Sequence, residues 1–365
     1  MHSSARPALL FRDARVGSPG KWGYPDALEE VRMIPQGAYW MRVNRFFGDA
    51  MMAYAAVEPL RRAGLPLVVW GPAAAVELFE GSANVVATVT EPGRKYGTWE
   101  AARMLRRHRP AGLIGFPKSA RPHLAAWLAR VPLRLGCGDG GVSLLQTHSV
   151  AFYKRDDPFV QRYASVVSRA FPDLGPLGFT PFRPRVQAFE AQAVQRAETG
   201  FEGAYVVFAP GANSASKRLS VPLFAALGRR LAERSLGVVI LGAGAEDERL
   251  GRELLNQLPG ALNLVGRCSL SLSAAWICGA RALVGMDSGL GHIAAGAGIP
   301  TLAVFGPTRP RHSGPWGPRV RVVRREDLTC LECMAWGCPL PGHPCMNALD
   351  EAVLWQELTQ LLEAP

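Results

Sequence analysis

The sequence predicts an α/β protein with two doubly wound domains. Short apolar runs alternate with helical segments, the alternation stops in a stretch rich in Pro and Gly near the middle of the chain, and it then restarts. Such alternation is typical of parallel sheets covered by helices on both faces. The 365 residues, 48% hydrophobic and 19% charged, can supply a core to each domain. Disordered, collagen-like and small disulfide-rich proteins are therefore excluded.

The first half of the chain is expected to form one of these domains. Residues 1–37 show no sustained period and are predicted to be an N-terminal extension, to which we assign no function. The domain itself is expected over residues 38–175. Its strands are predicted at Tyr39–Val43, Leu65–Trp70, Val85–Val89, Leu113–Phe116 and Arg134–Gly136, and its helices at Asp49–Ala63, Ala73–Phe79, Thr98–His108 and Ala120–Ala129.

The second domain is expected over residues 203–365, after a linker over residues 176–202. The stretch from Phe171 to Arg185 holds several Pro and Gly residues, which disfavour a regular element. Strands are predicted at Ala204–Ala209, Gly237–Leu241, Leu262–Val265, Ala282–Met286, Thr301–Phe305 and Val320–Val323, and helices at Val221–Arg234, Asp247–Leu258, Leu272–Cys278, Leu290–Ala297 and Asp350–Leu362. In such sheets ligands bind beyond the carboxyl ends of the strands.

One strand-to-helix turn has the character of an anion site. Asp287, Ser288 and Gly289 lie where a buried strand turns into a helix, and His292 follows within the first turn. Free backbone N–H groups and the helix dipole favour a phosphate or diphosphate there. The same residues are equally consistent with a helix cap and a buried core histidine.

A second turn of this kind carries Lys217, one of only five lysines in the chain, on a loop of small residues after the strand that ends at Ala209. A mobile ammonium suits a polyphosphate, although a solvated surface cation is the alternative. The next loop, from Gly242 to Glu246, lacks the third glycine of a dinucleotide fingerprint, and no Walker pattern occurs.

The first domain offers a carboxylate in the corresponding loop. Asp49 is predicted either to cap a helix or to act as a general base that faces a cleft. Lys118, Arg121 and Arg134 flank strand ends of the same domain and are candidates for binding acidic groups of an acceptor, with surface solvation as the alternative.

The charge of the chain indicates what kind of partner it meets, and its cysteine content indicates the compartment in which it works. The net charge is +11; residues 1–182 carry 23 basic and 14 acidic side chains, whereas residues 183–365 carry 18 and 16. The first half is therefore expected to meet an anionic partner.

Seven cysteines without an export signal favour a reducing compartment. For the cluster of Cys330, Cys333, Cys338 and Cys345, the irregular spacing favours a metal-free thiol loop over a structural zinc site.

Taken together, the motifs resemble those of a known family. They are Arg45-Phe-Phe-Gly-Asp49-Ala-Met-Met, Pro117-Lys-Ser-Ala-Arg121, Pro210-Gly-Ala followed by Lys217-Arg218, Gly285-Met-Asp287-Ser288-Gly289 followed by His292, and Phe305-Gly-Pro-Thr308. In this order they are similar to the lipopolysaccharide heptosyltransferases, glycosyltransferase family nine, and the first motif is closer to heptosyltransferase II. The resemblance runs from about Tyr39 to the C-terminus.

The resemblance implies a GT-B fold, with an N-terminal acceptor domain and a C-terminal nucleotide-sugar domain that face a cleft. It implies inverting transfer of heptose from ADP-heptose to a lipid A–inner core acceptor, without a required metal, by a cytoplasmic enzyme peripheral to the inner membrane. Asp49 would be the general base. Lys217, Ser288 and Gly289 would hold the donor diphosphate, Asp287 and His292 match donor-site positions, and Glu246 or Glu248 would meet the ribose. Lys118, Arg121 and Arg134 would contact the acidic glycolipid.

Three other functions remain open. The donor of a family member can be another nucleotide sugar, and nucleotide-sugar 2-epimerases share the two-domain architecture. A non-catalytic binder of anions or nucleic acid would explain the charge of +11, but the arginines are spread over many helices without an aromatic-rich basic stripe, so we expect no nucleic-acid partner.

Overall fold

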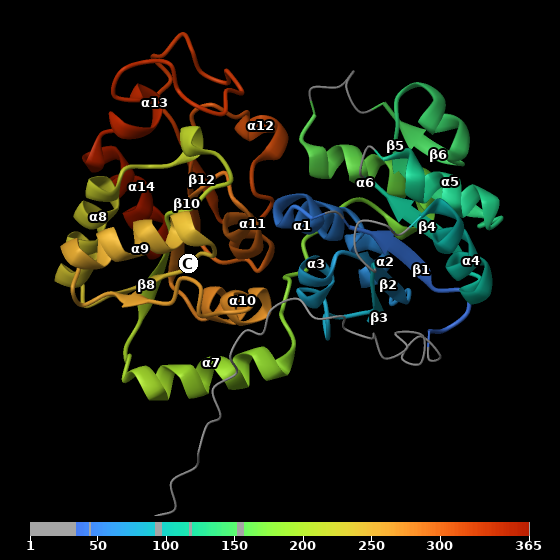
Figure 1. Ribbon diagram of the computed structural model, residues 1–365, viewed down its shortest axis with the longest axis horizontal. Coiled ribbons are helices and arrows are strands. Elements are labelled where there is room, and N and C mark those ends of the chain that lie inside the picture. The colour runs from blue at the N-terminus through green and yellow to red at the C-terminus, as the bar shows by residue number, and fades with distance from the viewer. Residues whose placement is uncertain (1–33, 44, 92–96, 117–118, 152–156, 365) are drawn as a thin grey trace, which may run out of the picture. The chain divides into compact units, whose positions relative to one another are not determined.

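Two parallel sheets with the same topology organise the chain. The computed structural model describes residues 34–43, 45–91, 97–116, 119–151 and 157–364. The first sheet has the strand order β3-β2-β1-β4-β5-β6, and the second has the order β12-β11-β10-β7-β8-β9 (Figure 1). All the strand pairs are parallel. In both sheets the winding reverses next to the first strand, which is the doubly wound arrangement expected from the sequence.

The first sheet is built as a Rossmann-like domain. Its strands are β1 Tyr39–Arg42, β2 Leu67–Gly71, β3 Val85–Thr90, β4 Gly112–Gly115, β5 Leu133–Cys137 and β6 His148–Val150. Its helices are α1 Phe47–Ala56, α2 Glu58–Arg62, α3 Ala73–Glu77, α4 Thr98–His108, α5 Ala120–Leu128 and α6 Phe159–Ala170, with short 3₁₀ turns at η2 Gly140–Leu145 and η3 Pro172–Leu174. The strands β1, β2 and β4 are almost wholly buried, as expected of continuous apolar runs between helical layers.

The second sheet repeats the plan. Its strands are β7 Tyr205–Ala209, β8 Gly237–Ile240, β9 Leu262–Asn263, β10 Ala282–Met286, β11 Thr301–Val304 and β12 Val320–Val323. Its helices are α8 Val221–Glu233, α9 Ala245–Gln257, α10 Leu270–Cys278, α11 Gly289–Gly296, α12 Pro310–Ser313, α13 Pro344–Asn347 and α14 Glu351–Glu363, with a 3₁₀ turn at η4 Ala215–Lys217. The helix α14 packs against α8 and the strands β10 to β12.

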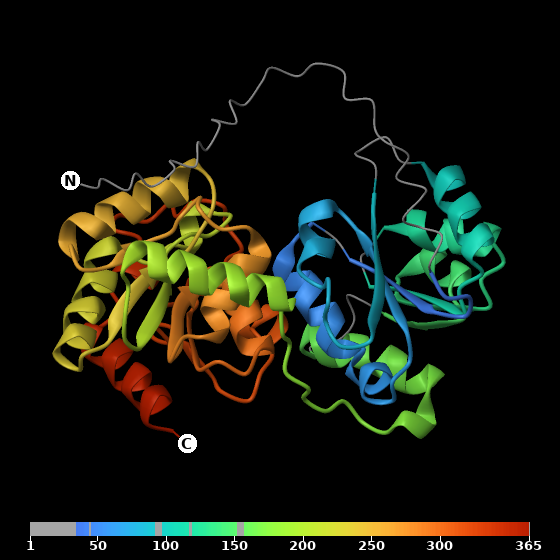
Figure 2. The same cartoon turned by 90° about the horizontal axis from the view of Figure 1, so that it is seen from below.

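One predicted helix was wrong in its extent, and a helix within the predicted linker was not predicted. The predicted helix Asp49–Ala63 is two helices, because α1 ends at Ala56 and Pro59 lies in the first turn of α2, where its missing N–H is tolerated. The predicted linker, residues 176–202, contains a fourteen-residue helix, α7 Val186–Thr199 (Figure 2). Its Ala-, Gln- and Glu-rich sequence favours a helix, which ends where Gly200 adopts a left-handed conformation.

The chain between the two sheets is fixed by buried polar contacts. The Glu58 carboxylate of α2, which is buried, accepts hydrogen bonds from the Gly178 N–H (2.9 Å) and the Thr180 hydroxyl (2.9 Å). On the other side, the Phe182 N–H donates to the Gly296 carbonyl at the end of α11. This segment therefore contacts elements of both sheets. No helix in the described part of the chain is long and apolar enough to cross a membrane.

Candidate active site

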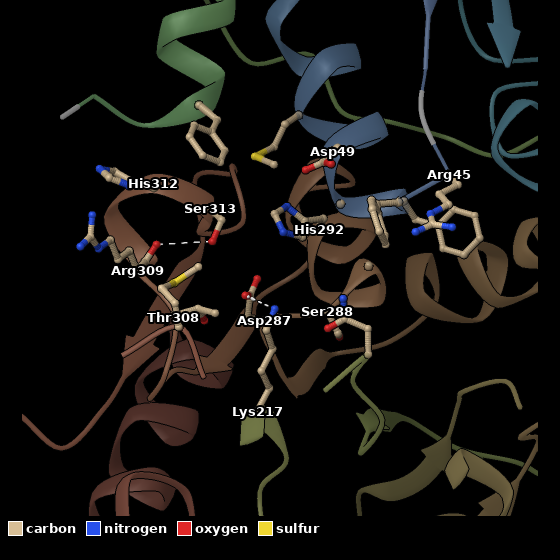
Figure 3. A pocket seen from close by; sticks show the side chains of 18 of the residues that line it. Arg45, Asp49, Lys217, Asp287, Ser288, His292, Thr308, Arg309, His312 and Ser313 are labelled. Carbon is tan, nitrogen blue, oxygen red and sulfur yellow. Dashed lines mark hydrogen bonds and ion pairs between the residues drawn. The ribbon is translucent and has the colours of Figure 1, made fainter. Parts of the chain in front are cut away.

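A cavity of about 720 Å³ lies where residues from both sheets meet, and most of the predicted site residues line it (Figure 3). The lining residues are Arg45, Phe46, Phe47, Gly48, Asp49, Met52, Phe159, Arg162, Asn213, Lys217, Asp287, Ser288, Gly289, His292, Thr308, Arg309, His312, Ser313 and Met334. Their place follows from the topology. Arg45 to Asp49 follow β1, Lys217 follows β7 and Asp287 follows β10, so the loops beside both topological switch points contribute to one cavity.

Asp49 belongs to the first turn of α1 and does not occupy the N-cap position. The N-cap is Phe46, so Asp49 is the third residue of the helix, and its side chain lines the cavity. Carboxylates are stabilised near a helix N-terminus by the macrodipole. Of the two roles expected for Asp49, the geometry favours a carboxylate that faces the cleft.

The N-terminus of α11 meets the same cavity from the second sheet. Ser288 is its N-cap residue, but the Ser288 side chain makes no capping hydrogen bond. Its Oγ is buried without a hydrogen-bond partner in the described structure, and the same holds for Oγ1 of Thr308. Both residues line the cavity. Buried hydroxyls without partners are costly, so two of them on residues that line one cavity indicate a site built for a polar ligand.

Lys217 and Asp287 form an ion pair across the cavity floor. The Lys217 ammonium donates to Asp287 Oδ2 at 2.7 Å, and the side chains are 18% and 10% exposed. Lys217 comes from the short turn η4 and Asp287 directly follows β10. The pair leaves the flexible ammonium at the cavity surface, with a carboxylate that fixes its position in the absence of a ligand.

His292 is a buried neutral base between the two sheets. Burial lowers the pKa of His292 despite the nearby carboxylates Asp287 and Asp49, which act to raise it, and Lys217 adds to the lowering. The imidazole is only 4% exposed, yet it lines the cavity. The neutral ring has one N–H donor and one acceptor nitrogen to offer a ligand.

Close packing of α1 on α11 brings the two sheets' residues together. A Cβ atom on Gly48 would lie 2.8 Å from Cδ2 of His292, and one on Gly289 would lie 3.0 Å from Cβ of Phe47. Both helix N-termini therefore approach each other through glycine. This contact holds the Asp49 carboxylate near the Asp287 and Ser288 loop.

The other predicted site residues lie outside this cavity. Glu246, in the first turn of α9, pairs with Arg218 (2.9 Å) and Arg249 (2.9 Å). Arg121 lines a separate cavity of about 70 Å³ together with Arg42. The Arg134 guanidinium donates to the carbonyls of Leu145 (2.8 Å) and Val131 (2.6 Å).

Lys118 lies outside the described residues. The acceptor-binding roles of Lys118, Arg121 and Arg134 thus stay predictions.

Several lining residues had no signal in the sequence strong enough to single them out as functional. Thr308 ends the Phe305-Gly-Pro-Thr motif, and its place after β11 is the feature that could have identified it. Arg162 is 2% exposed on α6, a helix absent from the sequence-based prediction. Arg309 and His312 lie at the short helix α12, and only the tertiary fold brings them to the cavity.

The cysteine loop braces the loop that carries Lys217. The Ser214 hydroxyl donates to the Trp336 carbonyl (2.7 Å) and the Ser216 hydroxyl to the Ala335 carbonyl (2.6 Å). Burial, together with smaller contributions from the neighbouring Cys338, Cys330 and Cys333, raises the pKa of the Cys345 thiol to about 11. Over the described ranges, no group of three or more His, Cys, Asp or Glu side chains is arranged to hold a metal ion. The metal content of the loop stays a prediction.

Two Rossmann-like domains that share a cavity at their strand ends define the GT-B class of fold. Solved structures with this fold include the ADP-heptose heptosyltransferase II of Escherichia coli, with a TM-score of 0.73, 23% identity, and coverage of 89% of this chain and 98% of that one. A glycosyltransferase of family 9 from Veillonella parvula aligns with a TM-score of 0.76, 17% identity, and coverage of 90% and 98%. The GT-B fold expected from the sequence is confirmed.

Sequence comparison defines the family. The model of glycosyltransferase family 9 (heptosyltransferase) matches residues 113–343, which is more than half of the chain. This protein therefore belongs to glycosyltransferase family 9, as the motifs indicated. It is 38% identical over 135 residues to lipopolysaccharide heptosyltransferase 1 of Pseudomonas aeruginosa, covering 37% of each protein. It is 31% identical over 232 residues to lipooligosaccharide heptosyltransferase 2 of Haemophilus influenzae, covering 58% of this chain and 64% of that protein. The matched regions thus span between a third and two thirds of these relatives.

Proposed function

We propose that this protein is an inverting glycosyltransferase that moves heptose from ADP-heptose to a lipid A–inner core acceptor. Family membership supports the reaction class, and two relatives are named for heptose transfer to lipopolysaccharide or lipooligosaccharide. The observation that carries the proposal is the shared cavity. Asp49 from the first domain and Lys217, Asp287 and the α11 N-terminus from the second line the same space.

In this mechanism Asp49 is the general base. Its carboxylate accepts the proton of an acceptor hydroxyl while that oxygen attacks the anomeric carbon of the donor sugar. The bond from the anomeric carbon to the diphosphate oxygen breaks, and the electron pair leaves with ADP. Attack from the face opposite the leaving group inverts the anomeric centre. A carboxylate on one domain and a diphosphate site on the other fit this geometry.

The second domain stabilises the leaving diphosphate. Lys217, the residues at the start of α11 and Thr308 all line the cavity, and the hydroxyls of Ser288 and Thr308 have no partner in the described structure. Donors that are already in place when negative charge develops on the leaving group lower the barrier without reorganisation. They supply the positive field that a divalent cation supplies in other transferases, so we propose that no metal is required. We propose that His292 contacts the same end of the donor, and that Asp287 contributes to donor binding by orienting the Lys217 ammonium.

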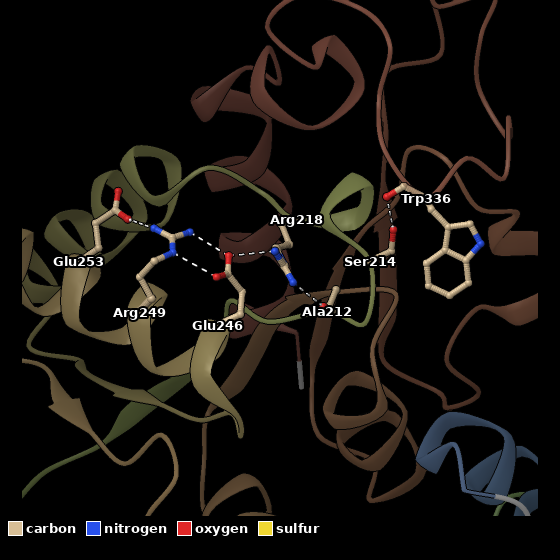
Figure 4. Close-up of polar contacts among 7 residues, drawn as sticks. All are labelled: Ala212, Ser214, Arg218, Glu246, Arg249, Glu253 and Trp336. Carbon is tan, nitrogen blue, oxygen red and sulfur yellow. Dashed lines mark hydrogen bonds and ion pairs between the residues drawn. The ribbon is translucent and has the colours of Figure 1, made fainter.

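The nucleoside of the donor would extend from Lys217 toward α9. Arg218 adjoins Lys217 in the chain and hydrogen-bonds both the Glu246 carboxylate and the Ala212 carbonyl (Figure 4). The Glu246 side chain is 39% exposed, so its carboxylate can be reached by ribose hydroxyls. We therefore keep Glu246 as a ribose-binding residue although it does not line the main cavity.

The acceptor would approach from the first domain, whose excess of basic side chains suits an acidic glycolipid. Lys118, Arg121 and Arg134 are the proposed acceptor-binding residues, with Arg121 the best placed among the described residues, beside Arg42 at the carboxyl edge of the first sheet. We propose a cytoplasmic location with peripheral contact to the inner membrane, where such an acceptor is available.

The test is a reaction of the purified protein with ADP-heptose and a heptose-deficient lipid A–inner core acceptor. We expect ADP release and an acceptor mass increased by one heptose, and we expect both to persist in EDTA. Substitution of other ADP and UDP sugars tests the donor. If ADP is released from none of the donor and acceptor pairs, the transferase proposal is wrong, and conversion of the donor sugar without an acceptor would instead favour an epimerase.

A further inference from the structure

The helices α4 and α5 form an exposed surface with an unusual side-chain content. They pack side by side over one face of the first sheet (Figure 1). Their inward sides are buried small and apolar residues, namely Ala101, Ala102, Leu105, Ala125 and Ala126. Their outward sides carry two large aromatic residues, Trp99, which is 68% exposed, and Trp127, which is 51% exposed. We call this outward surface the α4–α5 face.

The α4–α5 face is strongly basic. Its exposed arginines are Arg103, Arg106, Arg107, Arg109 and Arg130. From residue 97 to residue 130 the sequence contains a single acidic residue, Glu100. The Glu100 carboxylate accepts a hydrogen bond from the Gly97 N–H (2.7 Å) and so caps the N-terminus of α4. Because burial lowers the pKa of His108, that side chain adds no charge at neutral pH.

These arginines are not paired with carboxylates. Arg106 donates to the Leu128 carbonyl, and none of the five makes an ion pair in the described structure. Arginines of the second domain behave differently, since at least nine of them pair with Asp or Glu. These are Arg218, Arg230, Arg234, Arg249, Arg252, Arg309, Arg321, Arg324 and Arg325. A cluster of like charges that the fold leaves uncompensated attracts an anionic partner.

The exposed position of the two tryptophans on the α4–α5 face favours a lipid surface over a nucleic acid as its binding partner. Indole rings prefer the interface between water and lipid, where their apolar body is buried and their N–H stays hydrated. Each basic side chain near an anionic bilayer adds to the affinity. Single-stranded nucleic acids are usually held in grooves lined by aromatic rings, whereas Trp99 and Trp127 stand on the outside of two helices and line neither of the cavities described above.

We propose that the α4–α5 face docks on a bilayer that contains anionic phospholipid. Trp99 and Trp127 enter the headgroup region, and the five arginines meet the phosphates. The choice of a bilayer as the partner of this face rests in part on the proposed function, because an enzyme with a lipid-linked acceptor must work at a membrane. The charge and the exposed aromatics are independent of that function.

Vesicle flotation with the full chain tests this proposal. We expect binding to phosphatidylcholine vesicles that contain phosphatidylglycerol, little binding to phosphatidylcholine alone, and loss of binding at high salt. The double variants Arg103→Gln/Arg107→Gln and Trp99→Ala/Trp127→Ala should each weaken binding about tenfold or more. The control Arg229→Gln/Arg252→Gln removes two exposed arginines from the second domain and should bind like the unaltered protein.

The outcomes separate this proposal from the transferase proposal. The vesicles hold no acceptor, so binding does not require turnover, and ADP release can be measured separately with a delipidated acceptor. Unchanged binding by both α4–α5 variants, or equal binding to uncharged vesicles, would overturn the docking surface. Binding of single-stranded RNA in preference to the anionic vesicles would overturn it as well. These variants lie on the surface, where substitutions usually change stability by less than about 0.5 kcal/mol.

Discussion

The backbone of Gly48 lies directly against the imidazole of His292, with room for no side chain between them. A Cβ atom there would lie 2.8 Å from Cδ2 and 3.0 Å from Nε2 of the ring. Gly48 precedes Asp49 on α1, and His292 belongs to the first turn of α11. Together with the contact of Gly289 with Phe47, this contact limits how near the proposed base comes to the proposed donor site.

Replacement of Gly48 by alanine should disturb the site. The buried imidazole cannot move away freely, so we expect the free energy of unfolding to fall by about 1–3 kcal/mol and the transfer rate to fall with it. Urea unfolding and initial rates measure the two effects. Gly296→Ala is the matched control on α11. Its Cβ would press on the flexible end of the Met51 side chain and would make an ordinary contact with Cβ of Phe182, so we expect it to cost less. Equal effects of the two substitutions would contradict the role given to Gly48.

Asp49→Asn should abolish transfer while donor binding persists. The amide has the size of the carboxylate but cannot accept the proton, so we expect the rate to fall by about 10²–10⁴-fold. Calorimetric titration with ADP should give a dissociation constant close to that of the unaltered protein. Asp173→Asn, at an exposed position, serves as the control. Turnover by the Asp49 variant at the normal rate would reject this residue as the base.

Much of this arrangement could be predicted from the sequence, because short local patterns determine where each strand ends and each helix begins. Apolar strands followed by small-residue loops specify where each helix starts, so Asp49, Lys217, Asp287, Ser288 and His292 were all placed at strand ends and all line the cavity. What could not be predicted depends on tertiary contact or on weak local signals. The helix α7 lies within the predicted linker, and its start is hard to predict because the Pro- and Gly-rich stretch ends at Arg185, directly before the first residue of the helix.

The ion pair between Lys217 and Asp287 should show strong coupling in donor binding. Lys217→Met removes the ammonium and leaves the Asp287 carboxylate to repel the diphosphate, so we expect ADP affinity to fall about 10- to 100-fold. In the double variant Lys217→Met/Asp287→Asn that repulsion is absent, and part of the affinity should return. Isothermal titration of the single and double variants measures the coupling. Unchanged affinity of Lys217→Met would remove this residue from the diphosphate site.

His123 should make the first domain sensitive to acid. Burial lowers its pKa to about 4, while its Nε2 lies 2.8 Å from the Gly115 carbonyl. Because the unfolded chain binds the proton more tightly, this contribution to stability is complete above about pH 6.5 and is lost as pH falls toward 4. We expect a loss of about 2 kcal/mol between about pH 7 and about pH 5 from this group.

The variant His123→Gln keeps a donor for the Gly115 carbonyl but cannot titrate. Urea unfolding of the two proteins at both pH values isolates the contribution, since all other titrating groups are shared. The unaltered protein should lose more stability on acidification than the variant. Parallel pH profiles would mean that the imidazole is not held neutral by its burial.

The hydrogen bonds between the loop that carries Lys217 and the cysteine loop predict that Ser216 affects ADP binding, although Ser216 does not line the cavity. Ser216 is 3% exposed and donates to the Ala335 carbonyl at 2.6 Å, directly before Lys217 in the chain. Ser216→Ala leaves that carbonyl without this partner and should lower stability by about 1–2 kcal/mol. The freed loop should weaken ADP binding several-fold while the rate at saturating donor is little changed.

Ser220→Ala is the control, because Ser220 is the N-cap of α8 but makes no side-chain capping bond. If Ser216→Ala lowers stability but leaves ADP affinity as it was, the contact stabilises the fold alone and does not hold Lys217 in place.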